Sequence, residues 1–104
     1  MNNLRNPRLT HQSLKVLQTF MKRPVDTLSG ADVRRATKLW SGTLYPILIR
    51  FENAGLLTSD WEEIDPSEAG RPRRRLYKIT GHGIRIANEA FSDLALPAGN
   101  RALA

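Results

Sequence analysis

The 104-residue sequence contains no cysteine, which excludes disulfide bonds and thiolate metal sites. Its two histidines, His11 and His82, would need several carboxylate helpers to hold zinc, so we expect no metal and no other cofactor. Long apolar runs are missing too: none approaches the roughly 18 to 20 residues that cross a bilayer. The N-terminus also lacks the apolar middle of a signal peptide. We expect a cytoplasmic protein that has no membrane partner.

Candidate catalytic groups are missing as well. The sequence pairs no nucleophile with a base, offers no paired carboxylates for acid–base work and has no glycine-rich phosphate loop, so we do not expect an enzyme. Positive charge is what the sequence has in excess, because 16 Lys and Arg against 10 Asp and Glu give a net charge of +6. A basic single domain with one modest core favours a polyanionic partner.

Hydrophobic spacing of three and four residues predicts three helices in the first half of the chain. The first begins after a cap at Thr10 and the second after Ser29, and three residues separate the second from the third. The third helix, over 41–54, ends where Gly55 allows a left-handed turn. Its apolar stripe consists of Leu44, Ile47, Leu48 and Phe51.

Beyond Gly55 the apolar period drops towards two, which predicts a two-stranded hairpin. Its strands are expected over 56–64 and 73–80, on either side of a turn that contains proline and glycine. Thr80 then caps a fourth helix, which is expected to end before Pro97.

Three helices, a two-stranded hairpin and a last helix form the element order of a winged helix-turn-helix, an α+β fold that is mostly α. This domain, for DNA binding and dimerisation, is expected over 10–96. A flexible basic N-terminal arm is expected over 1–9 and a disordered tail over 97–104.

Pro46 stands near the start of the third helix, where a proline costs little. If Thr43 caps the helix, Pro46 is its third residue; if Ser41 is the cap, one hydrogen bond is lost and Gly42 makes room for the ring. Either cap places hydroxyl side chains and free N–H groups at a helix N-terminus, which is a good contact for a phosphate. Plain capping without a ligand explains the same residues.

Other side chains near the third helix have two interpretations each. Arg50 reaches a guanine edge if the helix enters a major groove, and otherwise is a solvated arginine. Tyr45 either touches a phosphate or packs on the hairpin. Trp40 and Trp61 are expected in the core or at an interface.

Charge is segregated along the hairpin. Its acidic residues come first, and its basic residues follow in the run Arg71, Arg73, Arg74, Arg75 and Lys78. In one interpretation the acidic and basic strands pair across the hairpin. In the other, residues 65–75 form a wing, in which Gly70 and Pro72 shape a narrow turn and Arg71 enters a minor groove or grips phosphates. The two interpretations are compatible.

The stretches "SGTLYPILIRFENAGLL", "WEE" and "GRPRRRLYKITGHG" together resemble the winged-helix domain of the PadR family of bacterial transcriptional regulators. The resemblance implies a homodimeric repressor that binds a partly palindromic operator in double-stranded DNA. The helix over 41–54 would then lie in the major groove, and the wing on the minor groove or the backbone. By this likeness the DNA contacts include Ser41, Gly42, Thr43, Tyr45, Gly70, Arg71 and Pro72.

The complete set of candidate DNA contacts is Ser41, Gly42, Thr43, Tyr45, Pro46, Arg50, Gly70, Arg71, Pro72, Arg73 and Arg74. The candidate dimer contact is the last helix, through Phe91 and Leu94, joined by Leu14 of the first. One alternative is a winged-helix module that docks on another protein through Ile49 and Trp40. Another is a DNA-binding protein for replication or partition of a mobile element. The sequence specifies neither an operator nor a small-molecule effector.

Overall fold

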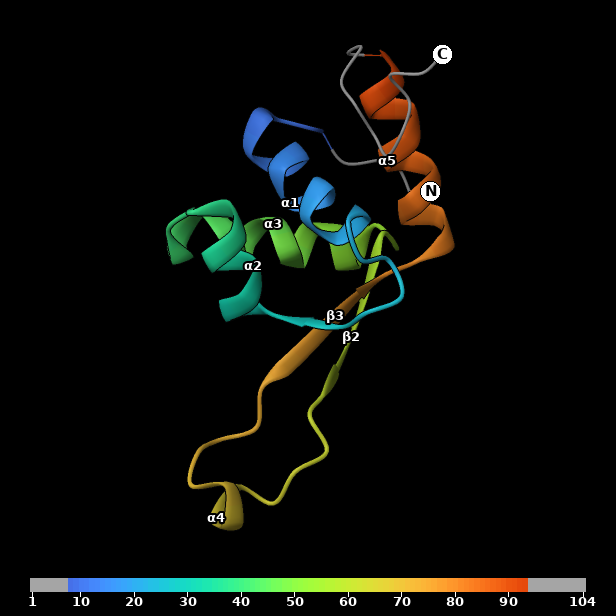
Figure 1. Cartoon of the computed structure of the whole chain (residues 1–104). Coiled ribbons are helices and arrows are strands. Elements are labelled where there is room, and N and C mark those ends of the chain that lie inside the picture. The colour runs from blue at the N-terminus through green and yellow to red at the C-terminus, as the bar shows by residue number, and fades with distance from the viewer. Residues whose placement is uncertain (1–7, 94–104) are drawn as a thin grey trace.

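The computed structural model describes residues 8–93, and their elements follow the order of a winged helix-turn-helix (Figure 1). The helices are α1 (His11–Met21), α2 (Gly30–Thr37), α3 (Ser41–Asn53), α4 (Pro66–Ala69) and α5 (Gly81–Asp93). The strands are β1 (Leu28–Ser29), β2 (Leu57–Trp61) and β3 (Arg75–Ile79). The predicted tail, nearly all of the predicted arm, and Leu94 lie outside the described residues.

Three helices begin at the predicted caps. The Thr10 hydroxyl accepts a backbone N–H from the first turn of α1 at 3.1 Å, and the Thr80 hydroxyl does the same for α5 at 2.9 Å. Ser29 and Asp32 form a reciprocal capping box at α2, in which each side chain accepts the other's backbone N–H. The bond from the Ser29 N–H holds the pKa of Asp32 below its ordinary value. Local capping chemistry therefore sets these helix starts.

The start of α3 differs from the prediction. Its cap is Trp40, which makes no side-chain capping bond, so neither Ser41 nor Thr43 is the cap. Pro46 is consequently the sixth residue of the helix and lies beyond the first turn. It offers no N–H to the carbonyl of Gly42, four residues earlier. A Cβ built on Gly42 meets nothing within 4 Å, so the ring does not need a glycine there.

One hydrophobic core joins α1, α3 and α5, and each of the three contributes a fully buried phenylalanine: Phe20, Phe51 and Phe91. The predicted apolar stripe of α3 is buried throughout, which confirms the inward face of that helix. Leu14 and Phe91 are only 8% and 1% exposed. The two expected dimer residues that the structure describes therefore lie in the protomer's own core, because an apolar period marks a buried face without saying whether the same chain covers it.

The sheet has one strand more than the two predicted. β1 is two residues long and pairs with β3 through Leu28 opposite Tyr77, which gives an antiparallel sheet in the order β1-β3-β2. β2 pairs with β3 from Leu57 opposite Ile79 to Trp61 opposite Arg75. A two-residue strand is too short to show any period in the sequence.

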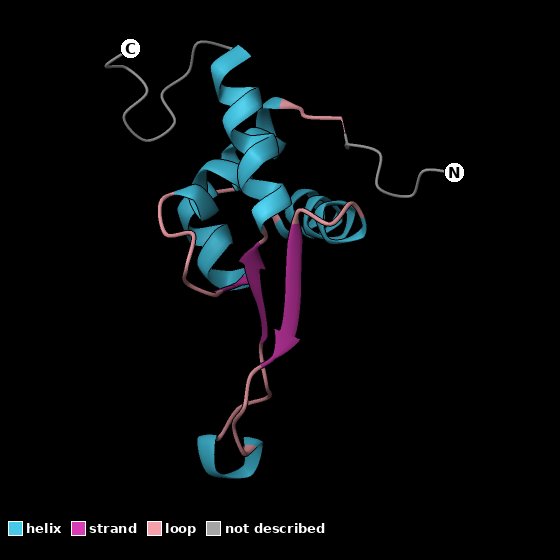
Figure 2. Cartoon of the chain, turned by 90° about the vertical axis from the view of Figure 1, so that its right-hand side faces the viewer, coloured by secondary structure: helices cyan, strands magenta, loops and turns pink. Residues whose placement is uncertain are grey.

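The hairpin projects away from the helical body and has α4 at its far end, as both views show (Figures 1 and 2). At its base, the Thr80 hydroxyl donates to the carbonyl of Gly55 at 2.6 Å, just after α3. Gly55 has the predicted left-handed conformation, with φ of 80°. No helix within residues 8–93 is long and apolar enough to cross a membrane.

Candidate nucleic-acid interface

The exposed face of α3 lies opposite its buried stripe. It consists of Ser41, Gly42, Tyr45, Pro46, Ile49, Arg50 and Asn53. These positions follow helical spacing, so their side chains share one face. The structure thus brings together five of the six candidates predicted on this helix, while Thr43 is only partly exposed at the border.

The N-terminal end of α3 offers two free backbone N–H donors, those of Ser41 and Gly42. The N–H groups of Thr43 and Leu44 both donate to the carbonyl of Trp40 at 2.9 Å. The N–H groups of Ser41 and Gly42 have no partner among residues 8–93, and both residues are exposed. Free N–H groups at the positive end of a helix dipole are suited to an anion.

Tyr45 links α3 to α2 and to the hairpin. Its ring and hydroxyl lie so close to Gly30 that a Cβ at that position would collide with them. A hollow of about 180 Å³ beside the ring is lined by residues of both neighbours, among them Arg74 and Arg75. The exposed face of α3 and the basic strand of the hairpin therefore meet at Tyr45.

A polar cluster fixes the base of the hairpin to the end of α3. The Ser59 hydroxyl donates to the Glu52 carboxylate at 2.6 Å and accepts from Arg75 Nε at 2.9 Å. The Arg75 guanidinium is 3.8 Å from the same carboxylate and lies 5.0 Å from the centre of the Trp61 ring. Burial and the Glu52 charge raise the pKa of Tyr77 beside it. No local sequence pattern indicated this cluster, since its hydrogen-bonded partners are 7 and 16 residues apart.

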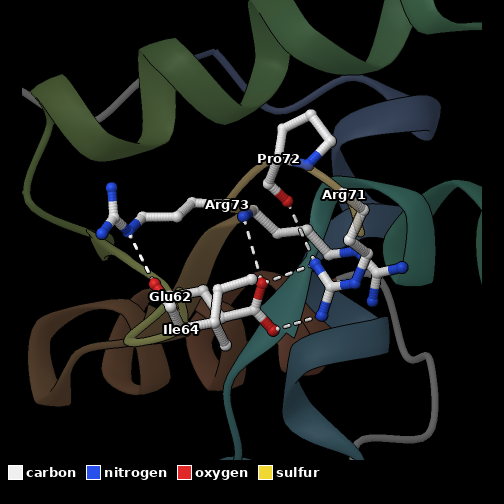
Figure 3. A network of polar contacts seen from close by, with 6 residues as sticks. Glu62, Ile64, Arg71, Pro72 and Arg73 are labelled. Atoms are coloured by element: carbon white, nitrogen blue, oxygen red, sulfur yellow. Dashed lines mark hydrogen bonds and ion pairs between the residues drawn. The ribbon is translucent and has the colours of Figure 1, made fainter. Parts of the chain in front are cut away.

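At the outer part of the hairpin, Arg71 is held by an acidic partner (Figure 3). Its guanidinium donates to both carboxylate oxygens of Glu62, at 2.8 and 3.0 Å, and to the Pro72 carbonyl at 3.1 Å. The Glu62 carboxylate also accepts the backbone N–H of Arg74 at 3.2 Å. The Arg71 hydrogen bond is the main reason why the pKa of Glu62 is lowered to about 2. The cross-hairpin pairing predicted from charge segregation is therefore present at Arg71.

The next basic residues have no such partner. Arg73 Nε donates to the backbone carbonyl of Ile64 at 3.1 Å, which leaves its charge uncompensated by a carboxylate. Within residues 8–93, Arg74, Lys78 and Arg50 also form no ion pair, and all are exposed. Of these cations, Arg73 and Arg74 belong to the wing over 65–75, so the wing carries free charge beside the paired Arg71, as the second interpretation needs for contact with a polyanion.

The turn of the hairpin is built differently from the narrow turn predicted. The segment forms one helical turn, α4, whose cap is the Asp65 carboxylate. Gly70 ends it with φ of 72°, a conformation that disfavours residues with a Cβ. Pro72 follows on the surface. Gly70 is thus required by the backbone, whatever its contacts.

A second basic surface beside α3 was not predicted. Trp40 and Trp61 are 76% and 55% exposed and are not core residues. The Arg34 guanidinium lies 5.7 Å from the centre of the Trp40 ring, and a hollow of about 280 Å³ there is lined by Arg34, Arg35, Lys38, Leu39 and Trp40. The spacing of the three cations along α2 was the available signal.

Comparison with known proteins gives a family and a fold. Residues 30–89 match the model of a family described as "Transcriptional regulator PadR-like family". The comparison with curated proteins found no match.

Several solved structures are similar. A PadR family transcription regulator from Clostridium difficile is 19% identical with a TM-score of 0.67, over 81% of this chain and 86% of that one. Another, from Eggerthella lenta, is 20% identical with a TM-score of 0.64, over 81% and 75%. The adhesin competence repressor AdcR from Streptococcus pyogenes is 14% identical with a TM-score of 0.64, over 85% of this chain but only 58% of AdcR. At these identities the likeness establishes the winged-helix fold alone.

Proposed function

The chain belongs to the PadR-like family of transcriptional regulators, and on that premise we propose that it represses transcription as a homodimer bound to a partly palindromic operator in double-stranded DNA. No catalytic role is proposed. The observation that carries the proposal is the meeting of the exposed face of α3 with the basic strand of the hairpin at Tyr45, where Arg74, which forms no ion pair among residues 8–93, lines the hollow beside the ring. One duplex can contact both.

We assign α3 to the major groove. The free N–H groups of Ser41 and Gly42 would bind a phosphate, with the Ser41 hydroxyl and Thr43 beside them. Arg50 carries no ion pair among the described residues and is the candidate for a bidentate contact to guanine. Tyr45 and Pro46 complete the surface that faces the bases.

The wing, residues 65–75, is assigned to the minor groove or the backbone. Arg73 and Arg74 supply its free charge, whereas Gly70 and Pro72 shape the chain that carries them. Arg71 stabilises the wing through its ion pair with Glu62. The guanidinium N–H groups that do not bind Glu62 contact DNA.

Dimerisation is part of the proposal, with the domain over 10–96 as the unit. In a symmetric dimer the two α3 helices would enter successive major grooves about 34 Å apart. Because Leu14 and Phe91 are buried within the protomer, the contact between copies must use other residues.

A salt series tests the proposal. The duplex from upstream of the protein's own gene is titrated with the dimer at several salt concentrations, and log K is expected to fall linearly with log salt, by about 0.9 per phosphate contacted. Arg50→Ala should weaken binding by relaxing one base position, at a cost of about 1 to 3 kcal/mol. Arg85→Ala is the matched control, because Arg85 is an exposed arginine on α5. Affinity that ignores salt would contradict the proposal.

A protein-docking role is the second candidate, and the exposure of Ile49 and Trp40 favours it. Replacing Arg50 and Arg71 by alanine separates the two roles. Loss of DNA retention with an intact dimer supports the regulator, whereas unchanged DNA binding supports the docking module.

A further inference from the structure

Ile49 occupies the middle of the exposed face of α3. At about 100° per residue, Ser41 and Arg50 mark the two edges of this face, nearly 180° apart, and Ile49 lies about 80° from Ser41. It is 56% exposed, whereas the other aliphatic side chains of α3 are buried. The helix folds on its opposite stripe, so the core does not explain an isoleucine at this position.

The residues that precede Ile49 on the face are poor in hydrogen-bonding groups. Gly42 has no side chain, Pro46 has no N–H and no polar side-chain atom, and the Tyr45 hydroxyl is turned against Gly30. Polar side chains of the face stand at its edges, at Ser41 and Arg50, and in its last turn, at Asn53. On its N-terminal side, the middle of this face therefore offers apolar contact, whereas Asn53 lies one turn beyond Ile49 on the same face.

We propose that Ile49 reads the C5-methyl group of a thymine in the major groove. The thymine methyl is the apolar group that base edges present in that groove. Gly42 lies two turns before Ile49 on the same face and is open, since a Cβ there meets nothing within 4 Å, so a base edge can approach the backbone at that point. Each half-site then combines a thymine opposite Ile49 with the base pair contacted by Arg50. This inference rests on the proposed function, because it needs α3 in the groove.

The test removes the methyl group from the DNA. A binding site is first selected from a random duplex pool with the wild-type protein, and each thymine is then replaced singly by uracil. One position in each half-site should weaken wild-type binding about fourfold, the value of one buried methyl group, while the other positions should change little. This arm needs no protein variant, so folding of a mutant does not limit it.

Ile49→Ala completes a double-mutant cycle. The variant should bind the thymine site at least about fourfold more weakly than the wild type and should no longer distinguish thymine from uracil there. Val25→Ala is the matched control, because Val25 is 78% exposed and lies in the α1–α2 connection; it should keep the full methyl preference. Thermal unfolding of both variants is recorded alongside.

The outcomes separate the inference from the function beneath it. If the wild type selects a site but tolerates uracil everywhere, or if Ile49→Ala keeps the same methyl preference, the inference is wrong and DNA binding stands. If the wild type selects no site and binds DNA at no salt concentration, the proposed function itself fails. A loss of methyl preference confined to Ile49→Ala supports the assignment.

Discussion

The exposed face of α3 and the wing both carry arginines, but these arginines differ in whether a carboxylate compensates their charge. Arg50 on α3 forms no ion pair within the described residues, whereas Arg71 in the wing donates to both oxygens of Glu62. α3 is shaped by burial of its inner stripe, but the outer hairpin contains no buried residue and is shaped by polar contacts. Arginine is therefore an unpaired charge on α3 and a stabilising ion-pair partner in the wing.

The difference has a physical origin. A helix packed on a core holds its outer face in place without help from that face, so the outer residues are free for a ligand. An extended hairpin with little apolar burial needs contacts across its strands. The two regions should respond differently to packing changes, to loss of charge and to pH.

The largest effect is expected on the packed side of α3. Leu48→Ala removes a fully buried side chain from the inner stripe of the helix and should destabilise the protein by about 2 to 5 kcal/mol. Gly42→Ala, on the open outer face, should instead be neutral or stabilise by up to about 1 kcal/mol. Urea unfolding measures both. If the two substitutions had equal effects, the packed and open sides of α3 would not differ as described.

The second test compares free and tied arginines within the wing. Arg73→Ala with Arg74→Ala should lower DNA affinity by about tenfold, and should flatten the salt slope by about 1 for each lost phosphate contact. Arg71→Ala should also change the Trp61 fluorescence spectrum of the DNA-free protein, because the wing loses the ion pair between Arg71 and Glu62. Anisotropy titrations and the fluorescence of Trp61, in a Trp40→Phe background, separate the two effects. If all three substitutions changed DNA affinity and Trp61 fluorescence alike, Arg71 would not differ from Arg73 and Arg74 as described.

The smallest effect is the response of the wing to acid. Because the folded protein lowers the pKa of Glu62 to about 2, this carboxylate contributes stability that is fully present above its ordinary pKa of 4.5 and is lost as the pH falls through about 2. Trp61 fluorescence should thus stay constant from pH 7 to well below 4.5. Glu62→Gln should show the altered wing signal already at neutral pH while the helical signal is retained. A wing transition centred near pH 4.5 in the wild type would contradict the ion pair.

The sequence predicted those parts of the fold that depend on neighbouring residues. The caps at Thr10, Ser29 and Thr80 and the stop at Gly55 are local, so pattern reasoning found them. The sequence did not indicate Trp40 as the cap of α3, because its side chain makes no capping bond. The hydroxyl residues Ser41 and Thr43 were predicted as the cap instead.

The missed features depend on contacts between distant residues. β1 exists because Leu28 pairs with Tyr77 on β3, and the cluster at the base of the hairpin forms because Ser59 contacts both Glu52 and Arg75. The burial of Leu14 and Phe91 likewise requires α1 to pack on α5. The candidate DNA residues themselves were chosen by spacing and resemblance, and their contacts with DNA remain a prediction.

In the proposed complex, one duplex covers both the exposed face of α3 and the basic strand of the hairpin. Amide hydrogen exchange, followed by NMR with and without the selected site, tests this arrangement. New protection is expected at the free N–H groups of Ser41 and Gly42 and along residues 70–75, with α5 unchanged at Arg85. Protection at α5 with none at Ser41, Gly42 or the hairpin would contradict it.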